Sequence, residues 1–96
     1  MDKIRQTQIW KFKVNTTGDT ELQMPAGARV IHVAGNPTGL TGVYLWAIVD
    51  PATALETRRF KSVGTGFGFD EFGLEHLGTA ICGAFVWHVF EQINVR

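Results

Sequence analysis

Basic and aromatic side chains lie next to each other at two places along the chain. Lys11 follows Trp10, and Arg58 and Arg59 directly precede Phe60. An arginine guanidinium forms paired hydrogen bonds to phosphate, and an aromatic face stacks on a nucleobase. This combination predicts a site for a small nucleotide-like anion. The same residues are also typical of solvated strand faces with tryptophans in the core, so both interpretations stay open at the level of sequence.

A run of alternating glycines, from Gly64 to Gly68, follows these arginines. Glycines allow backbone amides to approach an oxyanion, but neither the G-x-G-x-x-G dinucleotide fingerprint nor the Gly-Lys-Ser/Thr of a P-loop is present. Two interpretations remain, a turn that needs glycine and a backbone nest for an anion. Under the second interpretation Gly64, Thr65 and Gly66 join the candidate site.

The tryptophans give a further indication of a binding site. Three tryptophans in a chain of 96 residues are more than packing requires. Aromatic residues at partly wet positions are typical of ligand sites and subunit contacts. The complete set of candidate ligand-binding residues is Trp10, Lys11, Trp46, Arg58, Arg59, Gly64, Thr65, Gly66 and Trp87.

The sequence predicts no metal site. The three histidines, His32, His76 and His88, lie far apart, and there is no H-E-x-x-H motif and no cysteine pair. His32 and His88 fall inside apolar segments, where we expect partly buried, hydrogen-bonded imidazoles. His76 beside Glu75 is expected to be a solvated pair on a loop.

The sequence also predicts no catalytic centre and no cofactor. Cys82 has no cationic neighbour in the sequence and is expected to be a small buried hydrophobe. The acids Asp70, Glu71 and Glu75 are typical of a solvated loop. No nucleophile, base and orienting residue occur together. We therefore expect a binding protein rather than an enzyme.

The composition restricts the partners. The chain has nine Lys plus Arg, nine Asp plus Glu, 45% hydrophobic residues and one cysteine. Equal charges argue against long nucleic acid or an anionic membrane as partners. However, residues 1–61 hold eight of the nine basic residues and residues 62–95 hold none, so one pocket can still attract a small anion. The lone cysteine and apolar runs of about seven residues predict a cytoplasmic protein without a membrane span.

Short segments with period-two alternation, separated by Gly, Pro, Asn and Asp, predict strands joined by turns. The expected strands are Gln8–Val14, Thr20–Met24, Arg29–Ala34, Gly42–Val49, Thr57–Val63, Ala80–Cys82 and Ala84–Phe90. Together they predict one all-β domain over residues 1–96, a small antiparallel β-sandwich or partly open barrel of six to seven strands. One long glycine-rich loop, Gly64–Gly78, interrupts it.

Four features of this arrangement are specific enough to test. Gln8–Val14 and Thr20–Met24 are expected to form a first hairpin. Val43–Val49 is apolar at every position, which predicts a central strand covered on both faces. Thr57–Val63 carries outward charges, which are typical of an edge strand. Gly83 is expected to form a bulge or bend near the last strand.

Four motifs, in this order along the chain, resemble a family of short phage-encoded proteins of uncharacterised function. They are Ile9-Trp10-Lys11, Leu45-Trp46-Ala47-Ile48-Val49-Asp50-Pro51, Arg58-Arg59-Phe60 with Gly64-Thr65-Gly66, and Val86-Trp87-His88-Val89-Phe90-Glu91. The resemblance spans nearly the whole chain. It implies a phage accessory protein in the cytoplasm of a bacterial host.

An accessory protein of this kind is expected to counter bacterial defence. By analogy with phage sponge proteins, it would sequester a nucleotide-derived immune signal without cleaving it, in a pocket of a homo-oligomer. One alternative is a protein-binding inhibitor of a host defence factor, which would use Asp70, Glu71 and Glu75. Another is a virion or replication accessory protein. The small core of so short a chain favours self-association.

Overall fold

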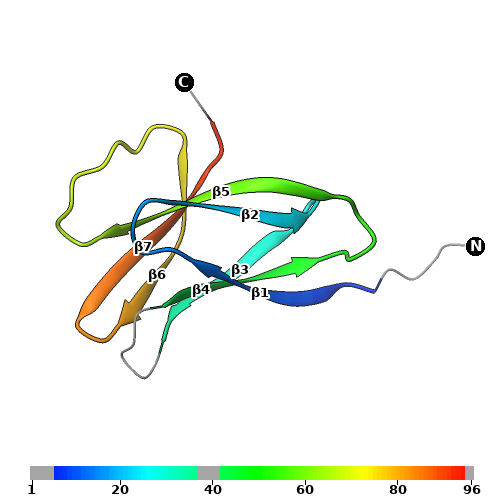
Figure 1. The fold of residues 1–96 in the computed structure, drawn as a ribbon, viewed down its shortest axis with the longest axis horizontal. Helices are drawn as coiled ribbons and strands as arrows, with labels where there is room; N and C mark the ends of the chain where they lie inside the picture. The colour runs from blue at the N-terminus through cyan, green and yellow to red at the C-terminus, as the bar shows by residue number, and fades with distance from the viewer. Residues whose placement is uncertain (1–5, 37–41, 95–96) are drawn as a thin grey trace, which may run out of the picture.

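The computed structural model describes residues 6–36 and 42–94, which form seven strands (Figure 1). The strands are β1 (Gln8–Val14), β2 (Asp19–Pro25), β3 (Arg29–Gly35), β4 (Val43–Val49), β5 (Leu55–Gly64), β6 (Leu74–Cys82) and β7 (Phe85–Gln92). All strand pairs are antiparallel and form two sheets, with the strand orders β1-β4-β3 and β2-β5-β7-β6. This arrangement confirms the predicted all-β fold, a small sandwich whose sheets do not close into a barrel. Among the described residues, no helix is long and apolar enough to cross a membrane.

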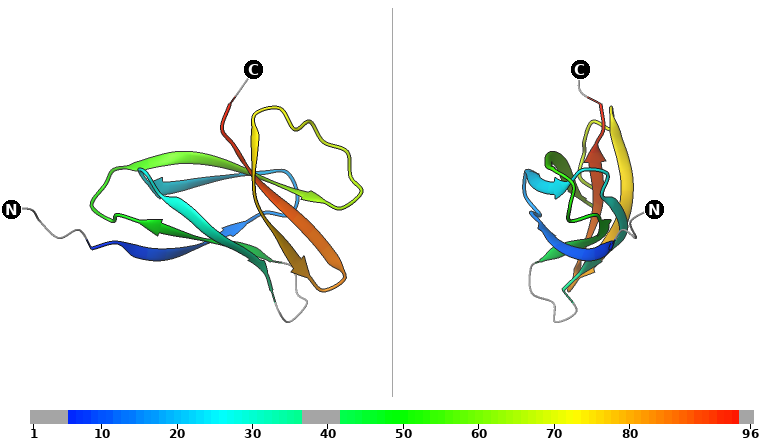
Figure 2. Two further views of the ribbon diagram at one scale, coloured as in Figure 1. Left: turned by 180° about the vertical axis from the view of Figure 1, so that it is seen from behind. Right: turned by 90° about the vertical axis from the view of Figure 1, so that its right-hand side faces the viewer.

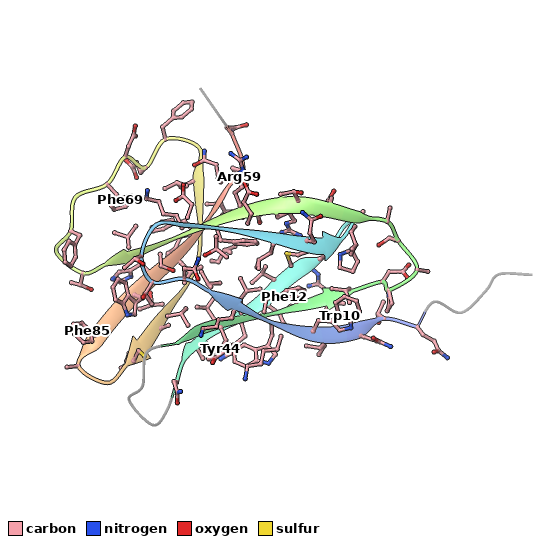
Figure 3. The ribbon with its side chains drawn as sticks, viewed as in Figure 1. Trp10, Phe12, Tyr44, Arg59, Phe69 and Phe85 are labelled. Atoms are coloured by element: carbon pink, nitrogen blue, oxygen red, sulfur yellow. The ribbon has the colours of Figure 1, made fainter. Side chains whose placement is uncertain are left out.

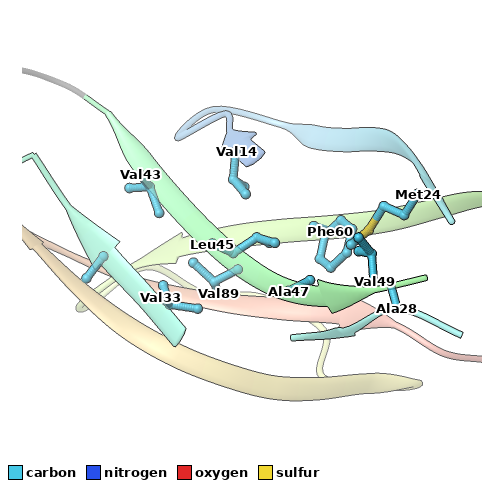
Figure 4. Packing of buried hydrophobic residues seen from close by; sticks show 11 residues of the cluster. Val14, Met24, Ala28, Val33, Val43, Leu45, Ala47, Val49, Phe60 and Val89 are labelled. Carbon is cyan, nitrogen blue, oxygen red and sulfur yellow. The ribbon is translucent and has the colours of Figure 1, made fainter. Parts of the chain in front are cut away.

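Alternate residues of β4 build the core between the two sheets. Val43, Leu45, Ala47 and Val49 are almost fully buried, because successive side chains of a strand point to opposite faces. The same cluster contains Phe60 of β5 and apolar side chains from both sheets (Figure 4). These are Val14, Met24, Ala28, Val33, Ala80 and Val89. The buried core therefore lies between the inner faces of the sheets.

The prediction of a first hairpin is wrong, because β1 and β2 belong to different sheets. β1 pairs with β4, whereas β2 pairs with β5. Residues 15–18 carry the chain from one sheet to the other, and the backbone N–H of Asn15 donates to Thr20 Oγ1 at 2.8 Å. Alternation predicts which face of a strand is wet, but it does not identify the neighbouring strand.

β4 is the middle strand of its sheet, as predicted, but the expectation that both of its faces are covered is wrong. Tyr44, Trp46 and Ile48 are half-buried on the outer face. The Tyr44 and Trp46 rings lie 6.5 Å apart, centroid to centroid, on this face. A strand can thus be apolar at every position without a second packed layer.

β5 is an inner strand between β2 and β7, and not the predicted edge strand. Its outward cations, Arg59 and Lys61, lie opposite Glu21 and Asp19 of β2. The nitrogen-to-oxygen distances are 3.0 Å for Arg59 and 3.8 Å for Lys61. Opposite charges facing each other across strands are favourable, so the charged residues of β5 do not require a free edge.

The long loop is shorter than predicted and covers residues 65–73. The segment Leu74–Cys82 forms β6 and pairs with β7. Gly83 lies in the turn between β6 and β7 with a φ of 61°, which confirms the predicted bend. The loop projects at the opposite end of the molecule from the beginning of β1 (Figure 2).

Two glycines allow the edge strands β3 and β6 to approach each other and so join the two sheets. A Cβ atom added to Gly35 would overlap the backbone carbonyl of Ile81. A Cβ atom added to Gly78 would lie 2.8 Å from the Cβ of Val33, closer than carbon atoms pack. The absence of side chains at these two positions is therefore a requirement of sheet packing.

Replacing Gly35 by alanine is expected to destabilise the protein by about 3 kcal/mol, near the upper end of the usual cost of overpacking. The atom in the way is backbone, which cannot rotate aside. Gly68→Ala is the matched control, because no atom lies within 4 Å of a Cβ at that position. Its stability should change by less than about 0.5 kcal/mol. Urea denaturation measures the free energy of unfolding of both variants. Equal values for Gly35→Ala and Gly68→Ala would contradict the close packing of β3 on β6.

Candidate functional site

The register between β1 and β4 places basic and aromatic side chains together on the outer face of the first sheet. Lys11 is the cross-strand partner of Trp46, and Lys13 is the partner of Tyr44. Lys11 Nζ lies 4.2 Å from the centroid of the Tyr44 ring and 5.6 Å from the centroid of the Trp46 ring. Both distances fit a cation–π interaction. Two of the predicted site residues, Lys11 and Trp46, therefore lie side by side.

β3 extends this surface on the other side of β4. The His32 and Trp46 rings lie 5.5 Å apart, centroid to centroid, and Arg29 is the cross-strand partner of Ile48. We call this surface the aromatic–basic face. Its members are Ile9, Lys11, Lys13, Arg29, His32, Tyr44, Trp46 and Ile48.

The aromatic–basic face has no acidic residue in its strands. β1, β3 and β4 contain neither aspartate nor glutamate. Asp50 follows β4 directly, and its carboxylate accepts a hydrogen bond from the backbone N–H of Ala52 at 3.0 Å. The positive charges of Lys11, Lys13 and Arg29 are thus not balanced within their own strands, which favours the approach of an anion.

The other two predicted tryptophans pack on the inner side of the sheets. Trp10 lies opposite Ala47 and contacts the core, and its Nε1 donates to Gln8 Oε1 at 2.8 Å. Trp87 contacts the core from β7, where Gly64 is its cross-strand partner. Trp10 and Trp87 therefore do not share the aromatic–basic face with Trp46.

Arg58 points to the inner side of the second sheet and binds Glu91. Arg58 Nε lies 2.6 Å from Glu91 Oε2, and Nη2 lies 2.7 Å from Oε1, which is the paired geometry of a guanidinium and a carboxylate. Arg58 Nη1 also donates to the carbonyl oxygen of Ala28. The hydrogen bonds to Glu91 raise the pKa of Arg58 above its ordinary value, although burial opposes them. Arg58 is therefore a cation already matched by a buried acid.

Arg59, the next residue, points to the outer side of the second sheet, because neighbouring residues of a strand alternate. Its side chain is 60% exposed and pairs with Glu21. Arg59 and Tyr44 lie at opposite margins of the molecule in Figure 3. The two arginines that the sequence placed in one site therefore point to opposite sides of the second sheet. Neither lies on the aromatic–basic face.

The glycine run forms the turn after β5. Gly64 is buried, and a Cβ there would lie 2.8 Å from Cδ2 of Phe67. Thr65 Oγ1 lies 2.8 Å from His88 Nε2, and Gly66 has a φ of 90°, a conformation that favours glycine. Gly64, Thr65 and Gly66 thus stay together, on the second sheet and away from Lys11.

The histidines differ from expectation at two of three positions. His32 is exposed on the aromatic–basic face and is not partly buried. His76 lies in β6 and not on a loop. His88 is half-buried and hydrogen-bonded as expected, to Thr65 through Nε2 and to Thr79 through Nδ1 at 3.1 Å.

The side chains that could support metal binding or covalent chemistry are dispersed. Within residues 6–36 and 42–94, no group of three His, Cys, Asp or Glu side chains could hold a metal ion. Cys82 is buried, as predicted, with its Sγ 3.7 Å from the carbonyl oxygen of Gly42. The arrangement on the aromatic–basic face is suited to binding an aromatic anion.

Arg29 and His32 are members of the face that the sequence did not identify. Three positions apart in a regular strand, they would point to opposite sides. An irregularity between Val30 and His32 shifts the register and brings both onto the outer face. A bulge leaves little trace in a single sequence, so period-two alternation gave no signal for this pair.

Replacing the two neighbouring arginines should have very different effects on stability. Arg58→Met leaves Glu91 buried without its partner and should destabilise the protein by about 3–5 kcal/mol. Arg59→Met removes an exposed ion pair and should cost less than about 1 kcal/mol. Chemical denaturation measures the free energy of unfolding of each variant. Adding Glu91→Leu to Arg58→Met should restore part of the loss, and a stable Arg58→Met protein would show that the pair is not a structural one.

Comparisons with curated proteins and with solved structures gave no match for this chain. One family model, described as Domain of unknown function (DUF7352), matches residues 5–96. The match covers nearly the whole chain and agrees with the expectation of a family whose function is not known. This chain belongs to the DUF7352 family.

Proposed function

We propose that this protein binds a small nucleotide-like anion on its aromatic–basic face, without catalysing a reaction. The observation that carries the proposal is the placement of Lys11, Lys13 and Arg29 around Tyr44 and Trp46, on three strands without an acid. A nucleotide combines a flat ring with a phosphate. On this face, the aromatic side chains can stack on the ring and the cations can pair with the phosphate.

Trp46 is the side chain of the face on which a base would stack. It lies on the middle strand, half-buried, between Lys11 on β1 and His32 on β3. Stacking of a base on an aromatic side chain contributes roughly 1–3 kcal/mol. The flanking cations lie where the phosphate of a stacked nucleotide would extend, and Arg29 adds a guanidinium fork at the edge of the same face.

The dimensions of the face favour a small ligand over a long nucleic acid. β4 has seven residues, so the face is roughly 23 Å long. The cations of the second sheet, Arg59 and Lys61, are paired with Glu21 and Asp19 and do not extend the basic surface. The strand cations that no acid of their own sheet balances therefore lie on one side of the molecule.

We further propose the biological role that the resemblance to phage proteins suggests. In a bacterial host, a non-catalytic protein that holds a nucleotide-derived immune signal would keep that signal from its receptor. A second copy of the chain, packed over the aromatic–basic face, would bury the ligand and slow its release. The ligand would then be held intact in the cytoplasm of the host.

Calorimetric titration with a panel of cyclic nucleotides and ADP-ribose derivatives tests this proposal. The wild-type protein should bind at least one of them, and Trp46→Leu should weaken binding roughly 5- to 150-fold, the equivalent of one stacked base. Lys11→Met should also weaken it. Arg59→Met, which removes a cation from the other sheet, should bind as the wild type does. Heating the complex should release the ligand unchanged.

Two results would contradict this assignment. One is the absence of binding to every member of the panel. The other is equal loss of affinity in Lys11→Met and Arg59→Met, because Arg59 does not lie on the aromatic–basic face.

The loop between β5 and β6 favours a second candidate function, the binding of a host protein. Phe67, Phe69 and Phe72 are exposed on this loop, Phe67 by 71%, together with Asp70 and Glu71. Exposed aromatic side chains on a projecting loop are typical of protein contacts. This function corresponds to the inhibitor of a defence factor that the sequence left open.

Reversing the loop charges separates this candidate from nucleotide binding. Asp70→Lys with Glu71→Lys should abolish capture of a host protein from lysate and leave nucleotide affinity unchanged. Glu21→Lys with Glu56→Lys is the control, since both acids are exposed on strands of the second sheet. Capture that survives reversal at the loop but is lost in the control would place the contact elsewhere.

A further inference from the structure

β5 continues beyond the beginning of β2, and this leaves a pocket at one end of the second sheet. β2 begins at Asp19, which faces Lys61, so the last three residues of β5 have no partner strand on that side. A pocket of about 260 Å³ lies there, between the turn that joins β1 to β2 and the loop that follows β5. We call it the strand-end pocket. It lies apart from the aromatic–basic face, on the other sheet.

Aromatic side chains form the walls of the strand-end pocket. Phe67, Phe69 and Trp87 line it. Gly64 lets two of these rings approach the strand, since a Cβ there would lie 2.8 Å from Phe67 and 3.3 Å from Trp87. Phe69 is supported from behind by Phe90, at 5.2 Å between ring centroids. The pocket is therefore an apolar hollow that is open to solvent and suited to one face of a flat ring.

Two adjacent residues of β5, which point to opposite sides of the sheet, both border this space at the free edge of the strand. Ser62 is buried, and its hydroxyl has no hydrogen-bond partner among the described residues. An unpaired buried hydroxyl is unfavourable, so a ligand group that donated or accepted a hydrogen bond there would be stabilising. Lys61 also lines the pocket and is 39% exposed, with Asp19 at 3.8 Å. Among the described residues that line the pocket, none is acidic.

We propose that the strand-end pocket binds a small heteroaromatic carboxylate. The ring would lie among Phe67, Phe69 and Trp87, the carboxylate would pair with Lys61, and a ring N–H would hydrogen-bond to Ser62. The volume agrees with this class, because an apolar cavity of about 150 Å³ holds benzene and pockets for drug-sized ligands measure roughly 300–1,000 Å³. At about 260 Å³, the pocket suits a fused ring with a short side chain.

Three probes separate the contributions of the two polar residues. They are indole-3-acetate, 3-methylindole, which lacks the carboxylate, and naphthalene-1-acetate, which lacks the ring N–H. Titration followed by NMR should show saturable binding of indole-3-acetate with shifts at Phe67, Phe69 and Trp87. The other two probes should bind about tenfold more weakly, as expected for the loss of one ionic or hydrogen-bonding contact.

Variants of β5 then assign each preference to a residue. Lys61→Met should abolish the preference for indole-3-acetate over 3-methylindole, and Ser62→Ala should abolish the preference over naphthalene-1-acetate. Ser62→Ala should remain folded, because removing an unpaired buried hydroxyl does not cost a hydrogen bond. Arg59→Met is the matched control for Lys61→Met, since Arg59 lies two residues away on the same face but outside the pocket.

Clear outcomes would overturn the proposal. One is the absence of saturable binding for all three probes. Another is an equal effect of Lys61→Met and Arg59→Met on the preference for the probe that carries the carboxylate. Binding of indole-3-acetate that is lost in Lys11→Met and kept in Lys61→Met would also reject it, because the probe would then occupy the aromatic–basic face.

Discussion

The close approach of β3 to β6 determines how the two sheets can pack. Gly35 and Gly78 lack the side chains that would keep these edge strands apart, so the sheets meet along one side with backbone near backbone. The core then fills only the space between the inner faces. No second layer of described residues covers the outer face of the three-stranded sheet, which explains how a chain of 96 residues can present Tyr44 and Trp46 at its surface.

The distribution of charge follows from the same division into two sheets. The second sheet neutralises its cations, on the inner side through Arg58 and Glu91 and on the outer side through Arg59 and Glu21. The first sheet has cations and no acids in its strands. A net charge of zero for the whole chain is thus compatible with one strongly basic face, because the acids that balance the total lie elsewhere.

Most strands could be predicted from the sequence, since turns rich in glycine and proline separate segments of clear alternation. Which strand pairs with which could not be predicted. The pairing of β1 with β4 depends on where the chain crosses between sheets, and no local pattern records that crossing. The candidate site was predicted in part for the same reason. Lys11 and Trp46 meet through strand register, whereas Arg58 was placed in the site because adjacency in sequence conceals that it points to the core.

The proposed ligand binding on the aromatic–basic face would require a rearrangement that is small in energy. Lys11 lies over the Tyr44 ring, and moving it aside to admit a base would sacrifice a cation–π interaction of about 0.5–1 kcal/mol at an exposed site. A stacked base returns roughly 1–3 kcal/mol, and the displaced ammonium becomes available to the phosphate. Only side chains on the regular strands β1 and β4 need to move. On this proposal, the face would accept a ligand while the core beneath it keeps its packing, so little of the free energy of binding would be spent on reordering the protein.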